Sequence, residues 1–330
     1  MAAVIVEELR DPSALTALEP EWWELWHRST TATPFQAPAW LIPWSRHFGG
    51  DRLFVLTLRR DRRLVGILPL FRLEEPPASR LLPCGAGISD YLDGVFADEP
   101  CAAAEILLGH VRERQDVLDL FGLRPGSPLL HAPPPEGWTE VHVRGSPCLV
   151  LALPTVLPKS MQRNLRYCRR RAEKHGTLQF KRADLGAAPA FLEALFRLHG
   201  ARWADRGEAG VLADRTVRRF HREAAPVLAG AGLLRLYALL LDDRPVAIYY
   251  GFAAKGHAYY YLSGFEPDLA TLGLGTLIVG HAIEEATLEG AATFDFLGGQ
   301  EAYKYRWGAR DRPTFGRLLR RQVQYDEVQP

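Results

Sequence analysis

Long hydrophobic runs are missing from this sequence of 330 residues. No apolar stretch approaches the ~20 residues that a membrane-spanning helix needs. The first ten residues, Met1–Arg10, carry two acids and lack the cationic segment and the long apolar core of a secretory signal. These absences argue against a helical membrane protein, and we expect a soluble, cytoplasmic protein.

Cysteine is scarce and scattered. The chain has four, Cys84, Cys101, Cys148 and Cys168. None forms a Cys-x-x-Cys motif or lies beside a histidine at the spacing of a metal site. We therefore expect buried thiols in a reducing compartment and no bound metal.

An excess of charge of either sign is also absent. The 40 Lys and Arg nearly balance the 39 Asp and Glu, for a net charge of +1. This balance argues against binding of nucleic acid through overall charge, so partners must be recognised by local patches. One patch is prominent: between residues 159 and 174, seven cations face a single acid, Glu173. Five of these cations form one stripe on the helix predicted there: Lys159, Arg163, Arg166, Arg170 and Lys174.

This cationic stripe has two interpretations. It is a solvated helix face, or it binds an anionic partner such as the phosphates of coenzyme A, a nucleotide-sugar, or tRNA. Tyr167 alone accompanies it as an aromatic residue. We therefore expect a small phosphorylated ligand, with Arg163 among the substrate-binding residues, and regard other nucleic acids as unlikely partners.

The length and the 47% hydrophobic content suffice for two cores. An internal repeat supports this division. The turn region Asp61–Ile67 matches Asp242–Ile248 in its Asp, Arg, Val and Ile positions, and strand Leu118–Gly122 matches Phe294–Gly298. We predict an α/β fold (α+β, with mixed sheets) made of two tandem duplicated modules, residues 1–153 and 154–330. The Pro- and Gly-rich segment 124–145 is expected to connect them.

The stretch 258–310 is the predicted chemical centre. An aromatic strand, 258–265, leads through a glycine turn into a helix over 276–289. A second strand follows over 293–297, and after Gly298 and Gly299 we expect a polar-aromatic helix over 301–307. A helix begins with free N–H groups and the positive end of its dipole, and glycines let a phosphate approach closely. The spacing predicts an anion cradle made of Gly273, Leu274, Gly275 and Thr276.

The first module lacks this cradle. Its matching segment, residues 92–100, has no paired glycines and carries acids. An anionic cofactor is therefore expected in the second module only, with the first as scaffold or as one wall of the acceptor site. Asp90 and Asp93 flank Tyr91 after a glycine-rich turn, so they are candidates for a catalytic base and an acceptor-binding acid, or they cap the turn.

His199 and Trp203 lie four residues apart on one face of the helix predicted over 188–206. They are a packed core pair or part of an acceptor pocket at the module interface, where ligand sites are common. Asp295 has a counterpart, Asp119, in the first module. Because both copies keep the acid, we predict that Asp295 serves the fold.

These residues resemble the GCN5-related N-acetyltransferase (GNAT) superfamily. The tandem arrangement is similar to the group containing Fem-type peptidoglycan aminoacyltransferases and acetyltransferases of cellulose or exopolysaccharide biosynthesis. The resemblance covers nearly the whole chain and rests on segments 33–40, 89–93, 199–203 and 294–307. One departure is Ala270, because the family usually has Gln or Arg three residues before the first glycine.

The resemblance implies an N-acyltransferase using acetyl-CoA or another acyl-CoA as donor. The acceptor would be an amine or hydroxyl on a sugar-linked or phosphorylated small molecule of polysaccharide or cell-envelope metabolism. Leu262, Ser263 and Gly264 would hold the donor through their backbone. Three residues would act on the reacting groups: Lys304 by stabilising negative charge, Tyr303 by protonating the thiolate, and Glu301 as a base through water. The alternative for each is a surface or packing role.

Two other functions stay open. An aminoacyl-tRNA-dependent, Fem-type transferase would show RNA-dependent activity and salt-sensitive binding through the basic helix. A non-catalytic module pair, acting as a binding or assembly protein, would fold correctly and bind no thioester.

Overall fold

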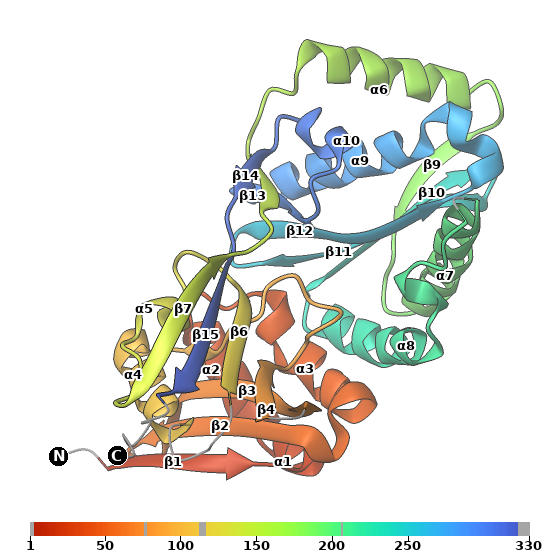
Figure 1. Cartoon of the computed structure of the whole chain (residues 1–330). Coiled ribbons are helices and arrows are strands. Elements are labelled where there is room, and N and C mark those ends of the chain that lie inside the picture. Colours follow the sequence, from red (N-terminus) through yellow and green to blue (C-terminus); the bar gives the residue numbers. More distant parts are fainter. Residues whose placement is uncertain (1–2, 76–77, 112–116, 206, 323–330) are drawn as a thin grey trace, which may run out of the picture. The chain divides into compact units, whose positions relative to one another are not determined.

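The computed structural model describes residues 3–75, 78–111, 117–205 and 207–322. They form two compact units, and each unit has its own mixed sheet (Figure 1). The first unit is Met1–Ser146 with Pro313–Pro330, and the second is Pro147–Arg312.

The first unit has the strand order β1-β2-β3-β4-β6-β15-β7, with β5 beside β3. All neighbours are antiparallel except β4 and β6, which are parallel. Apolar side chains of α4, including the fully buried Leu107, pack with those of the central strands. The strands are β1 (Val4–Leu9), β2 (Leu53–Arg60), β3 (Arg63–Glu75), β4 (Ala78–Pro83), β5 (Val95–Phe96), β6 (Val117–Leu123), β7 (Trp138–Arg144) and β15 (Phe315–Arg321). The α-helices are α1 (Pro12–Ala17), α2 (Glu19–Arg28), α3 (Pro38–Trp44), α4 (Pro100–Val111) and α5 (Pro128–His131).

The second unit has the order β14-β8-β13-β12-β11-β10-β9. Helices α6 and α9 cover one face of this sheet, and α7 and α8 cover the other (Figure 1). Its strands are β8 (Cys148–Ala152), β9 (Leu178–Arg182), β10 (Leu234–Leu241), β11 (Arg244–Ala254), β12 (His257–Phe265), β13 (Thr293–Gly298) and β14 (Arg310–Arg312). Its α-helices are α6 (Lys159–Ala172), α7 (Ala188–Ala204), α8 (Arg215–Gly230), α9 (Leu274–Leu288) and α10 (Ala302–Tyr305).

The two units share one topology. Four antiparallel strands, a parallel neighbour reached through a helix, and two further antiparallel strands occur in the same order in both sheets. The matched hairpins also use the same turn, because both central residues have positive φ: 49° and 70° at Asp61 and Arg62, 48° and 62° at Asp242 and Asp243. This is the type I′ pattern. The predicted tandem duplication is confirmed.

One pair of strands is exchanged between the halves of the chain. The predicted module boundary between residues 153 and 154 places residues 148–152 in the first module and residues 315–321 in the second. In the structure, β8 lies between β13 and β14, and β15 lies between β6 and β7. Both are short strands with two antiparallel neighbours, so their hydrophobic pattern does not specify which sheet they join.

Three local predictions were wrong. Segment 124–145 does not merely connect modules, because it forms α5 and the edge strand β7 of the first sheet. Cys101 is exposed in the first turn of α4, unlike the other three cysteines, which are buried. The helix expected over 301–307 shortens to α10, four residues long.

Candidate functional site

Strands β12 and β13 separate partway along their length. They pair in parallel at three positions, the last being Tyr259 with Asp295. Beyond that point β12 continues to Phe265 beside β11, while β13 stays beside β8. In the described residues, the edge of β12 that faces β13 has no strand partner after Tyr259. Its backbone N–H and C=O groups are available to a ligand.

The turn after β12 leaves the start of α9 uncapped. Gly273 has φ of +72°, and a Cβ there would lie 2.4 Å from Cys168 Sγ, so both conformation and packing require glycine. No side chain of the described residues caps α9. Thr276 N donates to Gly273 O at 3.0 Å, whereas Leu274 N and Gly275 N donate to no atom of the described residues. These two N–H groups and the positive end of the helix dipole are therefore available to an anion.

A cavity of about 280 Å³ lies at this helix start. Its walls come from α6, α7, β12, the glycine turn and the α10 region. It brings together five of the predicted site residues: Ser263, Gly273, Gly275, Thr276 and Tyr303. The remaining lining residues are Met161, Asn164, Arg202, Tyr260, Phe265, Ala270, Val279, Arg306 and Trp307.

Three hydroxyl groups line one wall of the cavity. Tyr260 Oη and Ser263 Oγ share a hydrogen bond, and Tyr303 is hydrogen-bonded to Tyr260. Burial raises the pKa of Tyr303 well above its usual range, and the neighbouring Tyr260 raises it further. Tyr303 therefore stays protonated at neutral pH and is a hydrogen-bond donor.

Two arginines add positive charge to the cavity. The Arg202 guanidinium lies 4.8 Å from the centre of the Phe265 ring, and its Nε is buried without a hydrogen-bond partner among the described atoms. A buried donor without a partner is costly, which favours an acceptor supplied by a ligand. Our site predictions omitted Arg202, Arg306 and Tyr260. The spacing of three residues from Tyr303 to Arg306 could have indicated that both lie on one helical face.

Lys304 and Glu301 lie outside the cavity lining and contact each other. The Lys304 side chain is buried, and its Nζ donates to the carbonyls of Gly298 and Gly299. Nζ also lies 2.9 Å from Glu301 Oε2. These contacts hold the turn after β13, directly before Tyr303. Asp295 also supports this turn, because its Oδ1 accepts a hydrogen bond from Leu297 N at 2.8 Å.

His199, Trp203 and Gly264 lie in the packing of α7 on β12, and none lines the cavity. The rings of His199 and Trp203 are 5.8 Å apart. Burial, with smaller contributions from Arg202 and Arg218, lowers the pKa of His199 to about 4. A Cβ at Gly264 would lie 2.5 Å from the backbone N of His199, so glycine lets α7 approach the strand.

Three more predicted residues contribute no side chain to the cavity. Leu262 is half-buried on β12, and Leu274 is fully buried in the core, so only its backbone can join the cradle. Arg163 is exposed on α6.

Asp90 and Asp93 belong to the first unit, in the loop between β4 and β5. Asp93 is buried and accepts a hydrogen bond from Gly94 N at 2.8 Å. Burial raises the pKa of Asp93 to about 6, against opposing contributions from Ser127, Arg124 and Gly94. Asp90 is half-buried beside it.

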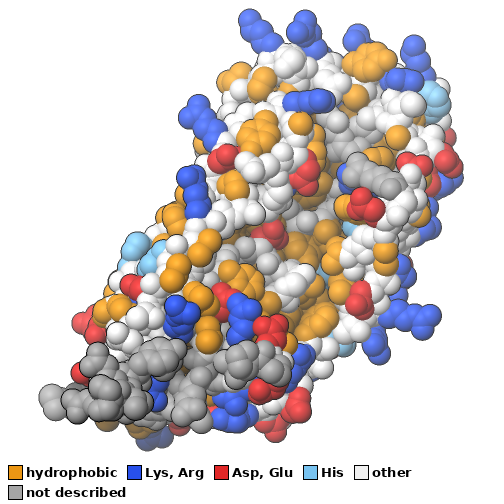
Figure 2. All heavy atoms as spheres, in the orientation of Figure 1, with side chains coloured by type: hydrophobic (Ala, Val, Ile, Leu, Met, Phe, Trp, Pro, Cys, Tyr) orange, Lys and Arg blue, Asp and Glu red, His pale blue; other side chains and the backbone are white. Residues whose placement is uncertain are grey.

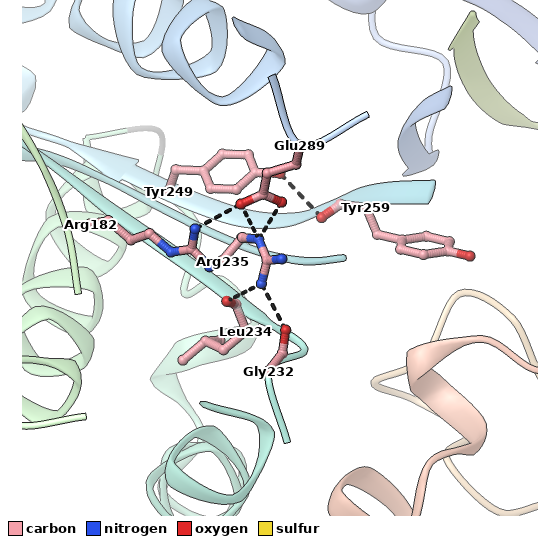
Figure 3. A network of polar contacts seen from close by, with 7 residues as sticks. All are labelled: Arg182, Gly232, Leu234, Arg235, Tyr249, Tyr259 and Glu289. Carbon is pink, nitrogen blue, oxygen red and sulfur yellow. Dashed lines mark hydrogen bonds and ion pairs between the residues drawn. The ribbon is translucent and has the colours of Figure 1, made fainter. Parts of the chain in front are cut away.

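Glu289, the residue after α9, anchors that helix to the sheet (Figure 3). Its carboxylate accepts hydrogen bonds from Arg182 on β9 at 2.7 Å and from Arg235 on β10 at 2.8 Å. Arg235 also donates to the carbonyls of Gly232 and Leu234. Two arginines thus fix the end of α9 opposite to the cavity.

Within the described ranges, no cluster of three or more His, Cys, Asp or Glu side chains could hold a metal ion. In the same part of the chain, no helix is both long and apolar enough to cross a membrane.

Residues 159–305, which include most of the cavity lining, match the family model described as an acetyltransferase (GNAT) domain. The chain has a GNAT-like fold. The likeness to solved structures extends over both units. FemX is 12% identical, with 94% of this chain and 96% of that chain covered and a TM-score of 0.63. L-PGS from Bacillus licheniformis is 11% identical, with coverages of 97% and 94% and a TM-score of 0.62.

A third solved structure is the C-terminal domain of a putative lysylphosphatidylglycerol synthetase from Agrobacterium fabrum. It is 12% identical, with coverages of 94% and 93% and a TM-score of 0.61. At these identities the likeness shows the GNAT-like fold alone. The comparison with curated proteins gave no match.

Proposed function

We propose that the second unit is an acyltransferase site that moves an acyl group from an acyl-CoA to an amine or hydroxyl acceptor. The observation that carries this proposal is the cavity of about 280 Å³ at the separation of β12 from β13. The uncapped start of α9 and the three hydroxyls of Ser263, Tyr260 and Tyr303 both face it.

The residues present fit a donor that carries phosphates and amides. The N–H groups of Leu274 and Gly275, with the Arg202 guanidinium, supply donors for phosphate oxygens. Ala270 provides no side-chain donor, and Arg202 compensates for it from α7. The unpaired edge of β12 beside Leu262 and Gly264 supplies backbone groups for the amides of the pantetheine arm.

The reaction requires proton transfer and charge stabilisation. The acceptor nitrogen or oxygen forms a bond to the acyl carbon, the carbon–sulfur bond breaks, and the departing sulfur takes a proton. Tyr303 is the proton donor in this proposal, because burial keeps its phenol protonated and Tyr260 and Ser263 continue the hydrogen-bond chain. The acceptor loses one proton to water, and water returns one proton to the Tyr303 phenolate, which restores the site.

Lys304 is assigned a positioning role in this proposal. Its ammonium is directed to the carbonyls of Gly298 and Gly299 and to Glu301, so it holds the turn that places Tyr303. Replacing Lys304 would therefore lower turnover through Tyr303. In this proposal the acceptor is an amine or hydroxyl on a sugar or small metabolite of polysaccharide or cell-envelope metabolism.

Calorimetric titration with acetyl-CoA and longer acyl-CoAs tests the donor. A Cβ at Gly275 would lie 3.2 Å from the Phe265 ring, and a carboxylate there repels phosphate, so Gly275→Glu should weaken binding by at least ~100-fold. Gly109→Glu is the matched control, because no atom lies within 4 Å of a Cβ at that glycine of α4. It should bind like the wild type.

Tyr303→Phe should keep donor binding and lower turnover by ~10²-fold or more in an acceptor screen. Binding of no acyl-CoA by the folded wild type would reject the donor and direct the search to aminoacyl-tRNA. Equal binding by wild type and Gly275→Glu would place the donor elsewhere.

A further inference from the structure

A groove of about 390 Å³ lies between α6, α9 and the segment that leads into α6. It shares no lining residue with the cavity described above. Its aliphatic part is formed by Leu157, Leu165, Leu277 and Ile283. Gly280 lets Leu165 approach α9, because a Cβ there would lie 2.8 Å from the leucine Cδ2. The groove is therefore a hydrocarbon-lined depression on the second unit.

Two exposed aliphatic side chains flank this groove. Val156 is 88% exposed and Leu288 is 76% exposed, the highest values among the large hydrophobic residues that the structure describes. Leu288 lines the groove directly, and Val156 lies between the lining residues Thr155 and Leu157. Such exposure is unfavourable in water and suggests an apolar partner.

Positive charge surrounds the same groove. Arg166 and Arg169 line it, and α6 with the two residues after it carries seven cations against Glu173. No ion pair joins these cations to a carboxylate of the described residues. Figure 2 shows Lys and Arg side chains gathered over the edge that α6 forms in Figure 1. Glu284 is the acidic residue in the groove lining. His281 also lines the groove, and its ring stacks on the ring of Phe180.

We propose that the groove and the cationic face of α6 dock the protein on a lipid bilayer that contains anionic phospholipids. Val156 and Leu288 enter the headgroup layer, and the α6 cations face the phosphates. The surface suits lipid better than nucleic acid, because bases stack on aromatic rings, the exposed rim residues are aliphatic, and α6 presents a single aromatic side chain, Tyr167. This inference is independent of the proposed acyl transfer.

Vesicle sedimentation of the full chain tests the proposal. Vesicles of phosphatidylcholine with phosphatidylglycerol should retain the protein at low salt, vesicles of phosphatidylcholine alone should retain much less, and high salt should release it. Val156→Asp/Leu288→Asp should weaken partitioning by ~10-fold or more, and Arg166→Gln/Arg169→Gln should do the same while reducing the salt dependence.

Matched controls lie elsewhere on the second unit. Leu185→Asp changes another leucine, 64% exposed, and Arg215→Gln/Arg219→Gln removes two exposed arginines of α8. Both should sediment like the wild type, and circular dichroism should show every variant folded. Absence of retention on anionic vesicles, or equal losses in the controls, would overturn the proposal. So would retention that Val156→Asp/Leu288→Asp leaves unchanged, or capture of structured RNA that anionic vesicles do not displace.

Discussion

Helices α4 and α9 occupy the same place in the two units, since each lies in the chain between two strands that pair in parallel, yet they begin in opposite ways. α9 follows Gly273 and has no side-chain cap. α4 follows Asp98 and Glu99, both with positive φ, and their carboxylates pair with Arg28 and Arg60. An acidic start repels the anion that an uncapped start attracts. Duplication preserved the topology, and the proposed donor site lies in the copy whose helix begins without a cap.

The largest predicted effect is that of acid, which should change the stability of the two units in opposite directions. Burial lowers the pKa of His199 to about 4 and that of His221 to about 3, from an ordinary 6.5. Below pH 6.5 the unfolded state takes up protons that the folded second unit excludes, so its stability is full above pH 6.5 and falls as the pH drops toward these values. By pH 5 the free energy of unfolding of the second unit should have fallen by roughly 3–4 kcal/mol for the two histidines together.

The first unit should respond with the opposite sign. The folded pKa of Asp93 is about 6, against an ordinary 3.8. Between pH 6 and pH 3.8 the folded state therefore holds a proton that the unfolded state has lost. Acidification from pH 6.5 to pH 5 should raise the free energy of unfolding of the first unit by about 1 kcal/mol. Hydrogen exchange followed by mass spectrometry can measure each unit separately. His221→Phe should remove about half of the acid sensitivity of the second unit, and equal responses of the two units would contradict the assignment.

A smaller effect is expected from alanine in the turn before α9. Gly273→Ala must adopt a φ of +72° and displace Cys168 Sγ, which should lower the free energy of unfolding by ~2–3 kcal/mol. Gly109→Ala in α4 has open space and should be neutral or stabilising by about 0.5–1 kcal/mol. Adding Cys168→Ala to Gly273→Ala should recover part of the loss. Denaturant unfolding, together with hydrogen exchange of the α9 peptides, measures this loss of stability. Equal stabilities of the two glycine variants would refute the packing argument.

The smallest effect should come from the acidic start of α4. Asp98 and Glu99 form exposed ion pairs, which contribute little, so Asp98→Asn/Glu99→Gln should change stability by under ~1 kcal/mol. Titration of the variant with acyl-CoA should match the wild type, because the first unit lacks the glycine turn. Creation of a second binding site by these two changes would show that charge alone had kept the first unit from binding.

The sequence indicated the architecture because local signals repeat. Asp61 and Asp242 mark the same turn in two hairpins, and Gly273 marks the start of α9. The exchange of β8 and β15 could not be predicted in this way, since pairing across the chain leaves no trace in a short apolar pattern. In the candidate site, Tyr303 and Ser263 could be named from the sequence, because each lies in a segment that its own residues identify. Arg202 was not assigned to the site, because its role depends on α7 packing over Gly264, and the burial of Lys304 depends on carbonyls that only the folded turn presents.

The exchanged strands also determine the order in which the two sheets can be completed during synthesis. β15 completes the first sheet by pairing with β6 and β7, although the whole second unit precedes it in the chain. A nascent chain that has released residues 1–146 therefore lacks the strand between β6 and β7, and both keep an open edge on the ribosome. The second unit has all its strands once residue 312 emerges. The unit that is translated first is the last to be completed.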